Sequence, residues 1–252
     1  MTFFEILPWV LCLGLGGSIF TLLCMLPQRD KSVFLEGVRD AYGSSLGLPN
    51  VVGQLALRSA SIHHAKGNGA GLLLDGEYLL TAAHVIHVKG DFPIAFAESP
   101  RSFWSAQKLK VVALDDVNDI ALCRLERTVV TLKLEPLMMS PLGYKITYED
   151  GFLDGQGCFL LLRKKLLGLR AFLKNSPVEP SKTLLIAKKE TEEHNFLPGD
   201  SGSVGLDLQG KICALCTASF HKDEGIKNAL GVGPNLEVIR AFLKAHWPNY
   251  QG

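Results

Sequence analysis

A serine between two glycines, just after an acidic residue, is the stretch of this sequence best suited to chemistry. Residues 196–203 read Phe-Leu-Pro-Gly-Asp-Ser-Gly-Ser, with Ser201 near the centre. A serine hydroxyl becomes a useful nucleophile when a neighbouring base takes its proton, and glycines let the backbone turn tightly and bring N–H groups close to a reacting carbonyl. The stretch therefore predicts acyl transfer, although Gly, Asp and Ser are also the ordinary residues of a surface turn.

Two upstream stretches supply the other groups that acyl transfer needs. In residues 78–85 an apolar strand ends at His84, and in residues 118–125 Asp119 opens a second apolar strand. The order His, Asp, Ser along the chain differs from the subtilisin order and from the α/β-hydrolase order. We expect His84 to act as the base and Asp119 to orient its imidazole. The alternatives are a histidine satisfied within the core, and Asp115 or Asp116 as the acid.

These segments resemble the trypsin-like, chymotrypsin-fold serine proteases, and most closely the compact bacterial members that include the HtrA-type protease domain. The Gly-rich residues 69–78 and residues 201–217 also follow that family, and the resemblance covers roughly residues 51–247. It implies an all-β fold of two six-stranded antiparallel β-barrels with a C-terminal helix, and a triad of His84, Asp119 and Ser201 that needs no cofactor. Ser203 and Val204 stand where Gly-Pro is usual, and we expect no PDZ module.

The resemblance also assigns residues around the nucleophile. It implies an oxyanion hole formed by the N–H groups of Gly199 and Ser201, and Gly199 is expected to need a backbone conformation that a residue with Cβ resists. The substrate pocket would be formed by Asn195, Thr217, Ala218, Ser219 and Gly231. Because Asn195 is neutral where trypsin has an acidic residue, we expect no strict preference for Lys or Arg. Asp200 needs a partner, but no Arg or Lys precedes Val51 to mark an activation cleavage.

The pattern of short apolar runs divided by Gly, Asp, Asn and Pro predicts the strands that position these groups. The predicted strands of the first barrel are residues 51–52, 54–57, 71–74, 78–82, 92–96, 109–114 and 120–125. Those of the second are residues 145–148, 158–162, 166–172, 183–188, 203–207, 212–219 and 231–232. Apolar residues at helical spacing predict a helix over residues 235–247, capped by Asn235.

The N-terminal part of the chain has a different composition. Residues 6–26 contain no charged side chain, and about 20 such residues suffice to cross a bilayer as a helix. We therefore divide the chain into a membrane anchor at 1–27, a linker at 28–50 and a protease domain at 51–252. The basic residues that follow the span would keep the domain in the cytoplasm by the positive-inside rule. The resemblance instead favours the extracytoplasmic, periplasmic side, which we take as our expectation for this single-pass protein.

Charge and cysteine content narrow the list of partners. The net charge of +1 suggests no nucleic acid or other polyanion as a partner. The six cysteines do not form a disulfide framework, because Cys213 and Cys216 lie three apart in one predicted strand and point to opposite faces. Cys123 and Cys158 are expected to be small buried side chains. We expect no metal site.

Together these observations predict a membrane-anchored serine endopeptidase. Its partners would be a polypeptide substrate and, through residues 6–26, the lipid bilayer; the sequence does not determine the oligomeric state. The main alternative is a protease-fold scaffold that binds peptides or a partner without useful turnover, which the departures at Ser203 and Val204 keep open. A viral processing protease released from a polyprotein is a third, narrower interpretation.

Overall fold

The computed structural model describes most of the region in which the histidine, aspartate and serine motifs lie. The described residues are 55, 58–64, 67–87, 94–96, 104–106, 109–126, 135–142, 157–162, 167–177, 179–188, 196, 198–220 and 228–251. The chain divides into two units, Met1–Ala41 and Tyr42–Gly252, and every described residue belongs to the second. The predicted anchor at 1–27 and linker at 28–50 lie outside the described residues. Among the residues that are described, no helix is both long and apolar enough to span a membrane.

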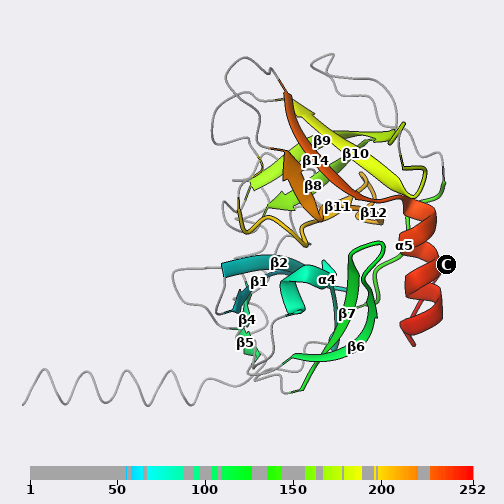
Figure 1. Ribbon diagram of the computed structural model, residues 1–252. Coiled ribbons are helices and arrows are strands. Elements are labelled where there is room, and N and C mark those ends of the chain that lie inside the picture. Colours follow the sequence, from blue (N-terminus) through cyan, green and yellow to red (C-terminus); the bar gives the residue numbers. More distant parts are fainter. Residues whose placement is uncertain are drawn as a thin grey trace, which may run out of the picture. The chain divides into compact units, whose positions relative to one another are not determined.

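A first antiparallel sheet of seven strands holds the histidine and aspartate motifs (Figure 1). Its strand order is β5-β4-β1-β2-β3-β7-β6. A four-residue helix, α4 (Ala83–Ile86), follows β3 directly. The strands are β1 Ser59–His64, β2 Gly67–Leu73, β3 Tyr78–Thr81, β4 Ile94–Phe96, β5 Trp104–Ala106, β6 Leu109–Asp115 and β7 Ile120–Leu125.

A second antiparallel sheet, also of seven strands, holds the serine motif. Its strand order is β12-β11-β8-β9-β10-β14-β13. The strands are β8 Gly157–Leu162, β9 Leu167–Asn175, β10 Lys182–Lys188, β11 Val204–Leu206, β12 Ile212–Leu215, β13 Ala218–Phe220 and β14 Asn228–Pro234. Within the described residues neither strand order closes on itself, so the closure of both sheets into barrels stays a prediction.

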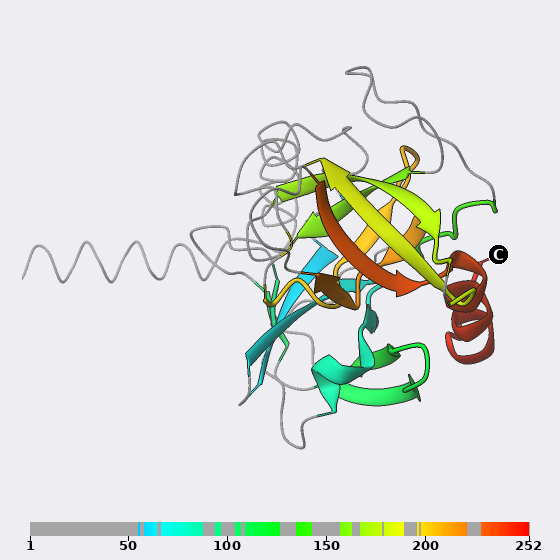
Figure 2. The ribbon, with the colours of Figure 1, turned by 45° about the horizontal axis from the view of Figure 1, so that its top comes forward.

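The C-terminal helix, α5 (Leu236–His246), confirms the helix that the apolar spacing predicts. Asn235 caps it, since its side-chain oxygen accepts a hydrogen bond from the backbone N–H of Val238 at 2.8 Å. Figure 2 shows that the last strand of the second sheet, β14, leads directly into this helix. The buried face of α5 joins a core cluster to which both sheets contribute. Its members include Leu72, Leu80, Ile120, Leu122, Val204, Ile212, Leu215, Ile239, Leu243 and Trp247.

Asp75 closes the tight turn between β2 and β3. Asp75 follows β2, and one of its carboxylate oxygens accepts the backbone N–H groups of Glu77 and Tyr78 at 2.7 and 2.8 Å. Its other oxygen accepts Trp247 Nε1–H and Asn249 Nδ2–H, both at 2.9 Å. Asp75 is only 4% exposed, so these four donors replace the water that a buried carboxylate loses. The β2–β3 turn is thereby joined to the segment that follows α5.

Several predicted strands need correction. Within the described residues each sheet has seven strands, one more than the six that the resemblance implies for each barrel. The predicted strand at 212–219 is two strands, β12 and β13, because Cys216 N–H binds the Ser203 carbonyl while Thr217 N–H binds that of Val232. Strand β1 was not predicted, since Ser-Ala-Ser-Ile-His-His has a single strong β-former, Ile62, and β5 was also missed. The predicted strands at 51–52 and 145–148, and nearly all of that at 54–57, lie outside the described residues.

Candidate active site

His84 is presented to solvent by a helix that is itself anchored in the core. Its neighbours in α4, Ala83, Val85 and Ile86, are all buried beneath the first sheet. The side chain of His84 is 50% exposed, which a histidine satisfied in the core would not be. The strand that ends at Thr81 and the short helix that follows therefore hold the backbone of His84 in place while its imidazole reaches the solvent.

Asp119 lies at the end of the β6–β7 turn and binds His84 twice. One carboxylate oxygen, Oδ2, is 2.8 Å from His84 Nδ1, and the other, Oδ1, accepts the backbone N–H of His84 at 2.9 Å. Among the described residues, Asp119 is the one non-glycine with a positive φ, at 59°. Asp and Asn tolerate this left-handed conformation better than most side chains, and such residues gather at functional sites. The turn geometry thus aims the carboxylate at the imidazole.

The two neighbouring acids have other partners. Asp115 accepts the backbone N–H and the side-chain Nδ2–H of Asn118 at 3.0 and 2.7 Å. Burial raises the pKa of the Asp115 carboxyl, but the hydrogen bonds from Asn118 and Val117 and the nearby Lys182 outweigh it, so the pKa lies below its usual value. Asp116 Oδ1 is 2.6 Å from His87 Nε2. Neither acid binds His84 among the contacts of the described residues.

Ser201 lies in a turn that is fastened to the first sheet although its own strand belongs to the second. Its carbonyl accepts the backbone N–H of Ala70 in β2 at 2.7 Å. The next residue, Gly202, has φ of 89°, and a Cβ there would overlap the Ala70 carbonyl oxygen and lie 2.5 Å from Thr81 Oγ1. Only glycine fits both this conformation and this close approach.

Thr81 connects the serine turn with the histidine segment. Its hydroxyl donates to the Ala70 carbonyl at 2.6 Å, and the residue is fully buried. Gly202 therefore touches the last residue of β3, and His84 follows that residue by three positions. Consecutive Cα atoms are about 3.8 Å apart, so the serine turn and the His84–Asp119 pair lie within a few residues' reach of each other. The structure brings all three motifs to one region.

The backbone before Ser201 agrees with the predicted turn. Gly199 has φ of 101°, which is the conformation that the sequence led us to expect there. Asp200 is 1% exposed, and its carbonyl accepts the N–H of Ser203 at 3.0 Å. Ser203 and Val204, which depart from the family pattern, are both buried. They pack inside the second sheet, where a departure from Gly-Pro is accommodated without exposing the turn.

The predicted pocket residues lie along one pair of strands. Ser219 in β13 is directly opposite Gly231 in β14. Thr217 precedes β13 and is buried, with its hydroxyl 3.3 Å from the Val232 carbonyl, while Ala218 is exposed. Asn195 lies outside the described residues. The structure thus brings four of the five predicted residues to one edge of the second sheet.

Comparisons with known proteins agree with this geometry. No protein-family model matches the sequence, and no curated protein matches it significantly. Among solved structures, the serine endoprotease from Yersinia pestis superposes with a TM-score of 0.54 at 15% identity, covering 77% of this chain. Rv3671c from M. tuberculosis H37Rv, in an inactive serine-to-alanine mutant, gives 0.50 at 14% identity, covering 81% of this chain and 95% of that one.

This chain has the trypsin-like serine protease fold. At these identities the likeness shows the fold alone, and the chain spans 64% of the length of the Yersinia pestis structure.

Two residues that complete this protease fold around the site were not assigned by sequence reasoning. Thr81 is one, and its position at the end of the apolar strand, three residues before the histidine, was the available signal. Phe196 is the other: it is 1% exposed, and its ring would lie 3.0 Å from a Cβ placed on Gly231. Phe196 therefore backs the predicted pocket. A lone aromatic residue five positions before the serine carried no signal of this role.

The cysteines of the protease fold are thiols in the core. Cys123, Cys158, Cys213 and Cys216 are all buried, and none of these four described cysteines forms a disulfide, which confirms the expected burial of Cys123 and Cys158. Burial raises the pKa of Cys123 to about 12. Burial also raises the pKa of Cys216, and the Asp200 carboxylate adds to the effect. Thiols of this kind are unreactive.

Proposed function

We propose that this protein is a serine endopeptidase in which Ser201 is the nucleophile, His84 the general base and Asp119 the orienting acid. The observation that carries the proposal is the double hydrogen bond from His84 to Asp119, next to a serine turn fastened to the same sheet. In that arrangement Nδ1–H donates to Asp119, so Nε2 has the lone pair that faces away from the acid.

The proposed reaction follows from these positions. The Ser201 oxygen attacks the peptide carbonyl while its proton passes to His84 Nε2, and the carbonyl oxygen gains the negative charge. The N–H groups of Gly199 and Ser201 would bind that oxyanion. The loss of one such donor typically raises the activation free energy by about 2.7–4 kcal/mol. The imidazolium then protonates the leaving amine, and water hydrolyses the acyl-enzyme by the same route.

We propose that the substrate is a polypeptide and that its side chain before the scissile bond enters a pocket beside Ser219 and Gly231. Phe196 and Cys216 both lie beside Gly231, 3.0 and 3.2 Å from where a Cβ on that residue would stand, so the protein itself occupies the space behind this edge. A pocket backed in this way, without an acidic residue among its described members, favours small uncharged side chains over Lys and Arg.

A fluorophosphonate probe tests the reaction, because it labels only an activated serine. Labelling should occur in the wild type and disappear in Ser201→Ala and His84→Ala. If folded wild-type protein takes up no label, the endopeptidase proposal fails, and the alternative of a protease-fold scaffold without turnover takes its place. Thermal unfolding of each variant shows whether a loss of label reflects chemistry or folding.

We further propose that residues 6–26 anchor the protein in a membrane with the protease domain on the extracytoplasmic side. The uncharged run supports the anchor, since about 20 apolar residues suffice to span a bilayer. The full chain should then stay in the membrane pellet after alkaline carbonate extraction. A Leu15→Lys variant, which places a charge at the centre of the run at a cost of about 2.5–3.5 kcal/mol, should be extracted more readily. Protease accessibility in spheroplasts reports the side.

A further inference from the structure

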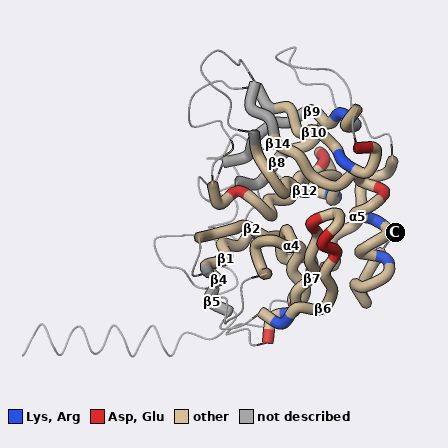
Figure 3. The backbone as a smooth tube through the Cα atoms, in the orientation of Figure 1, with Lys and Arg blue, Asp and Glu red and all other residues tan. Residues whose placement is uncertain are grey.

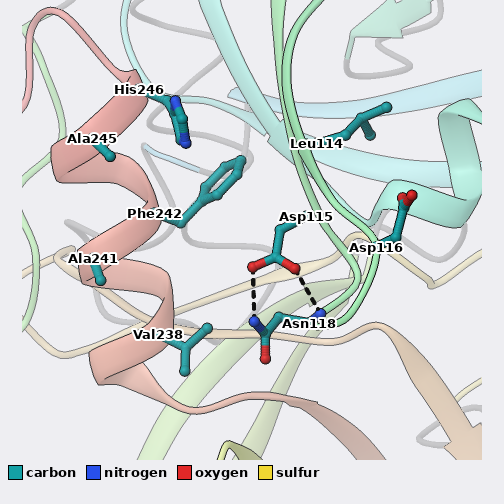
Figure 4. A pocket seen from close by; sticks show the side chains of 9 residues that line it. All are labelled: Leu114, Asp115, Asp116, Asn118, Val238, Ala241, Phe242, Ala245 and His246. Atoms are coloured by element: carbon teal, nitrogen blue, oxygen red, sulfur yellow. Dashed lines mark hydrogen bonds between the residues drawn. The ribbon is translucent and has the colours of Figure 1, made fainter.

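A cleft of about 560 Å³ lies between the β6–β7 turn and α5, apart from the candidate active site (Figure 4). None of His84, Asp119 and Ser201 lines it. The turn side contributes mainly Leu114 and Asp115, and the helix side contributes Val238, Ala241, Phe242 and Ala245. Ligand pockets in proteins commonly fall between about 300 and 1,000 Å³, so this cleft has room for two or three amino-acid residues.

The walls of the cleft are largely apolar and partly open to solvent. Leu114, on the edge strand β6, is 43% exposed. On the helix, Ala241 and Ala245 are one helical turn apart and both exposed, and the Phe242 ring points from the helix towards the β6–β7 side, as Figure 4 shows. Apolar side chains from the turn and from the helix therefore line the same opening.

The charge of the cleft has one sign. Figure 3 shows acidic residues gathered at the β6–β7 turn beside α5, and Asp115 and Asp116 both line the cleft. The side chain of Asp116 is 67% exposed. No Lys or Arg is found among the described residues of the lining, in which His246 is the remaining titratable group. The side-chain ammonium of Lys182 donates a hydrogen bond to the Val117 carbonyl of the same turn at 3.4 Å, but Lys182 does not line the cleft.

We propose that this cleft binds a segment of a partner polypeptide in which an Arg or Lys side chain stands beside a large aliphatic one. The aliphatic side chain would contact Leu114 and Phe242, and the cation would lie against the carboxylates of Asp115 and Asp116. The charge complementarity selects this occupant, since an acidic segment would meet two like charges.

The cleft shares its turn with the candidate triad. Asp116, which lines the cleft, binds His87 at the end of α4, and Asp119 of the same turn binds His84 near the start of α4. An occupant that contacts the turn therefore restrains both hydrogen bonds, from Asp116 and from Asp119, that join the turn to α4. This step rests on the proposed function, and it predicts that occupancy raises kcat with little change in KM.

Binding is tested on the full-length Ser201→Ala variant, which cannot cleave the probe. A fluorescently labelled peptide, acetyl-Gly-Leu-Arg-Leu-Gly-amide, is compared by anisotropy with the same peptide carrying Glu in place of Arg. We expect the Glu peptide to bind about fivefold more weakly, which is the upper end of what one exposed ion pair supplies. Equal binding of the two peptides would overturn the proposed charge recognition.

A matched pair of helix variants locates the binding site. Ala245→Trp fills the cleft and should abolish binding of the Arg peptide, whereas Lys244→Trp, at an exposed position of the same helix outside the lining, should leave it unchanged. Binding that survives Ala245→Trp in a protein with an unchanged unfolding temperature places the site elsewhere and overturns the proposal.

Turnover tests the link to the active site separately. In the otherwise wild-type enzyme, saturating Arg peptide should raise kcat at least twofold, and this gain should vanish in Ala245→Trp; mass spectrometry confirms that the peptide itself stays intact. Binding with an unchanged kcat overturns the coupling. Binding by a protein that hydrolyses no substrate and takes no fluorophosphonate overturns the coupling together with the proposed function, while the binding site stands.

Discussion

Replacing Asp119 with Asn separates the orientation of His84 from the folding of its surroundings. Asn is the substitution least disturbing to the turn, because after glycine it is among the residues best suited to the φ of 59° found at this position. The amide oxygen can still accept the backbone N–H of His84, which is an obligatory donor. The amide nitrogen then faces Nδ1, where a carboxylate oxygen stood at 2.8 Å.

This exchange reverses the role of the imidazole. A donor at residue 119 makes Nδ1 an acceptor, and the neutral ring then carries its proton on Nε2. A protonated Nε2 cannot take the proton of Ser201, so the base is lost although every atom stays close to its place. A change of this kind in a Ser-His-Asp triad lowers kcat by about 10⁴, and we expect a fall of that order here. The free energy of unfolding should change by less than about 1 kcal/mol, as for an isosteric change that keeps one hydrogen bond.

The assay measures kcat and KM on a quenched peptide, the rate of fluorophosphonate labelling and the unfolding temperature. Glu77→Gln is the matched control, because it makes the same acid-to-amide change at an exposed carboxylate that binds Arg124. If Asp119→Asn keeps more than a tenth of the wild-type kcat while Ser201→Ala is inactive, Asp119 does not orient the base. If Ser201→Ala is as active as the wild type, the whole triad assignment is refuted.

Three further predictions concern the framework of the site. Asp75→Asn should lower the free energy of unfolding by about 3 kcal/mol, because the carboxylate oxygen that accepts the Trp247 and Asn249 donors becomes an NH₂ group, itself a donor. In a thermal melt this change should lower Tm by roughly 6–12 °C, whereas Glu77→Gln should change Tm little. Gly202→Ala should reduce both the yield of folded protein and fluorophosphonate labelling, since a Cβ would overlap the Ala70 carbonyl; normal labelling would show that the turn can shift. Iodoacetamide at pH 8.5 should leave Cys123 unmodified in the native state and modify it after denaturation, because its pKa is about 12, as peptide mass spectrometry would report.

The three motifs of the proposed triad could be found from sequence because each is a local pattern with its own chemistry. An apolar strand that ends in small residues and a histidine must place that histidine at the end of a sheet strand, and the structure shows His84 two residues beyond Ala82, in a short helix. A glycine on either side of Ser201 signals a tight turn, and both glycines have positive φ. Even the choice of Asp119 over Asp115 could be made from the strand that follows it.

The contacts that assemble the site could not be found in this way, because they join residues far apart in the chain. Nothing near Asp75 in the sequence indicates that its second oxygen binds Trp247. Strand β1 was missed because Ile62 is its one strong β-former, and the strand is defined by its pairing with β2. The division of residues 212–219 into two strands likewise depends on which distant carbonyl each N–H finds.

The position of the serine turn shows why the motifs alone do not make a site. Ser201 precedes a strand of the second sheet, yet its carbonyl binds β2 of the first, and Gly202 fits between the carbonyl of Ala70 and the hydroxyl of Thr81. The proposed nucleophile is therefore held by the sheet that carries the proposed base and acid. Any change that separates the two sheets should move Ser201 away from His84 before either sheet unfolds, so activity should be lost at a lower denaturant concentration than secondary structure. Coincident loss of fluorophosphonate labelling and of circular dichroism in a urea titration would show instead that the two sheets unfold as one unit.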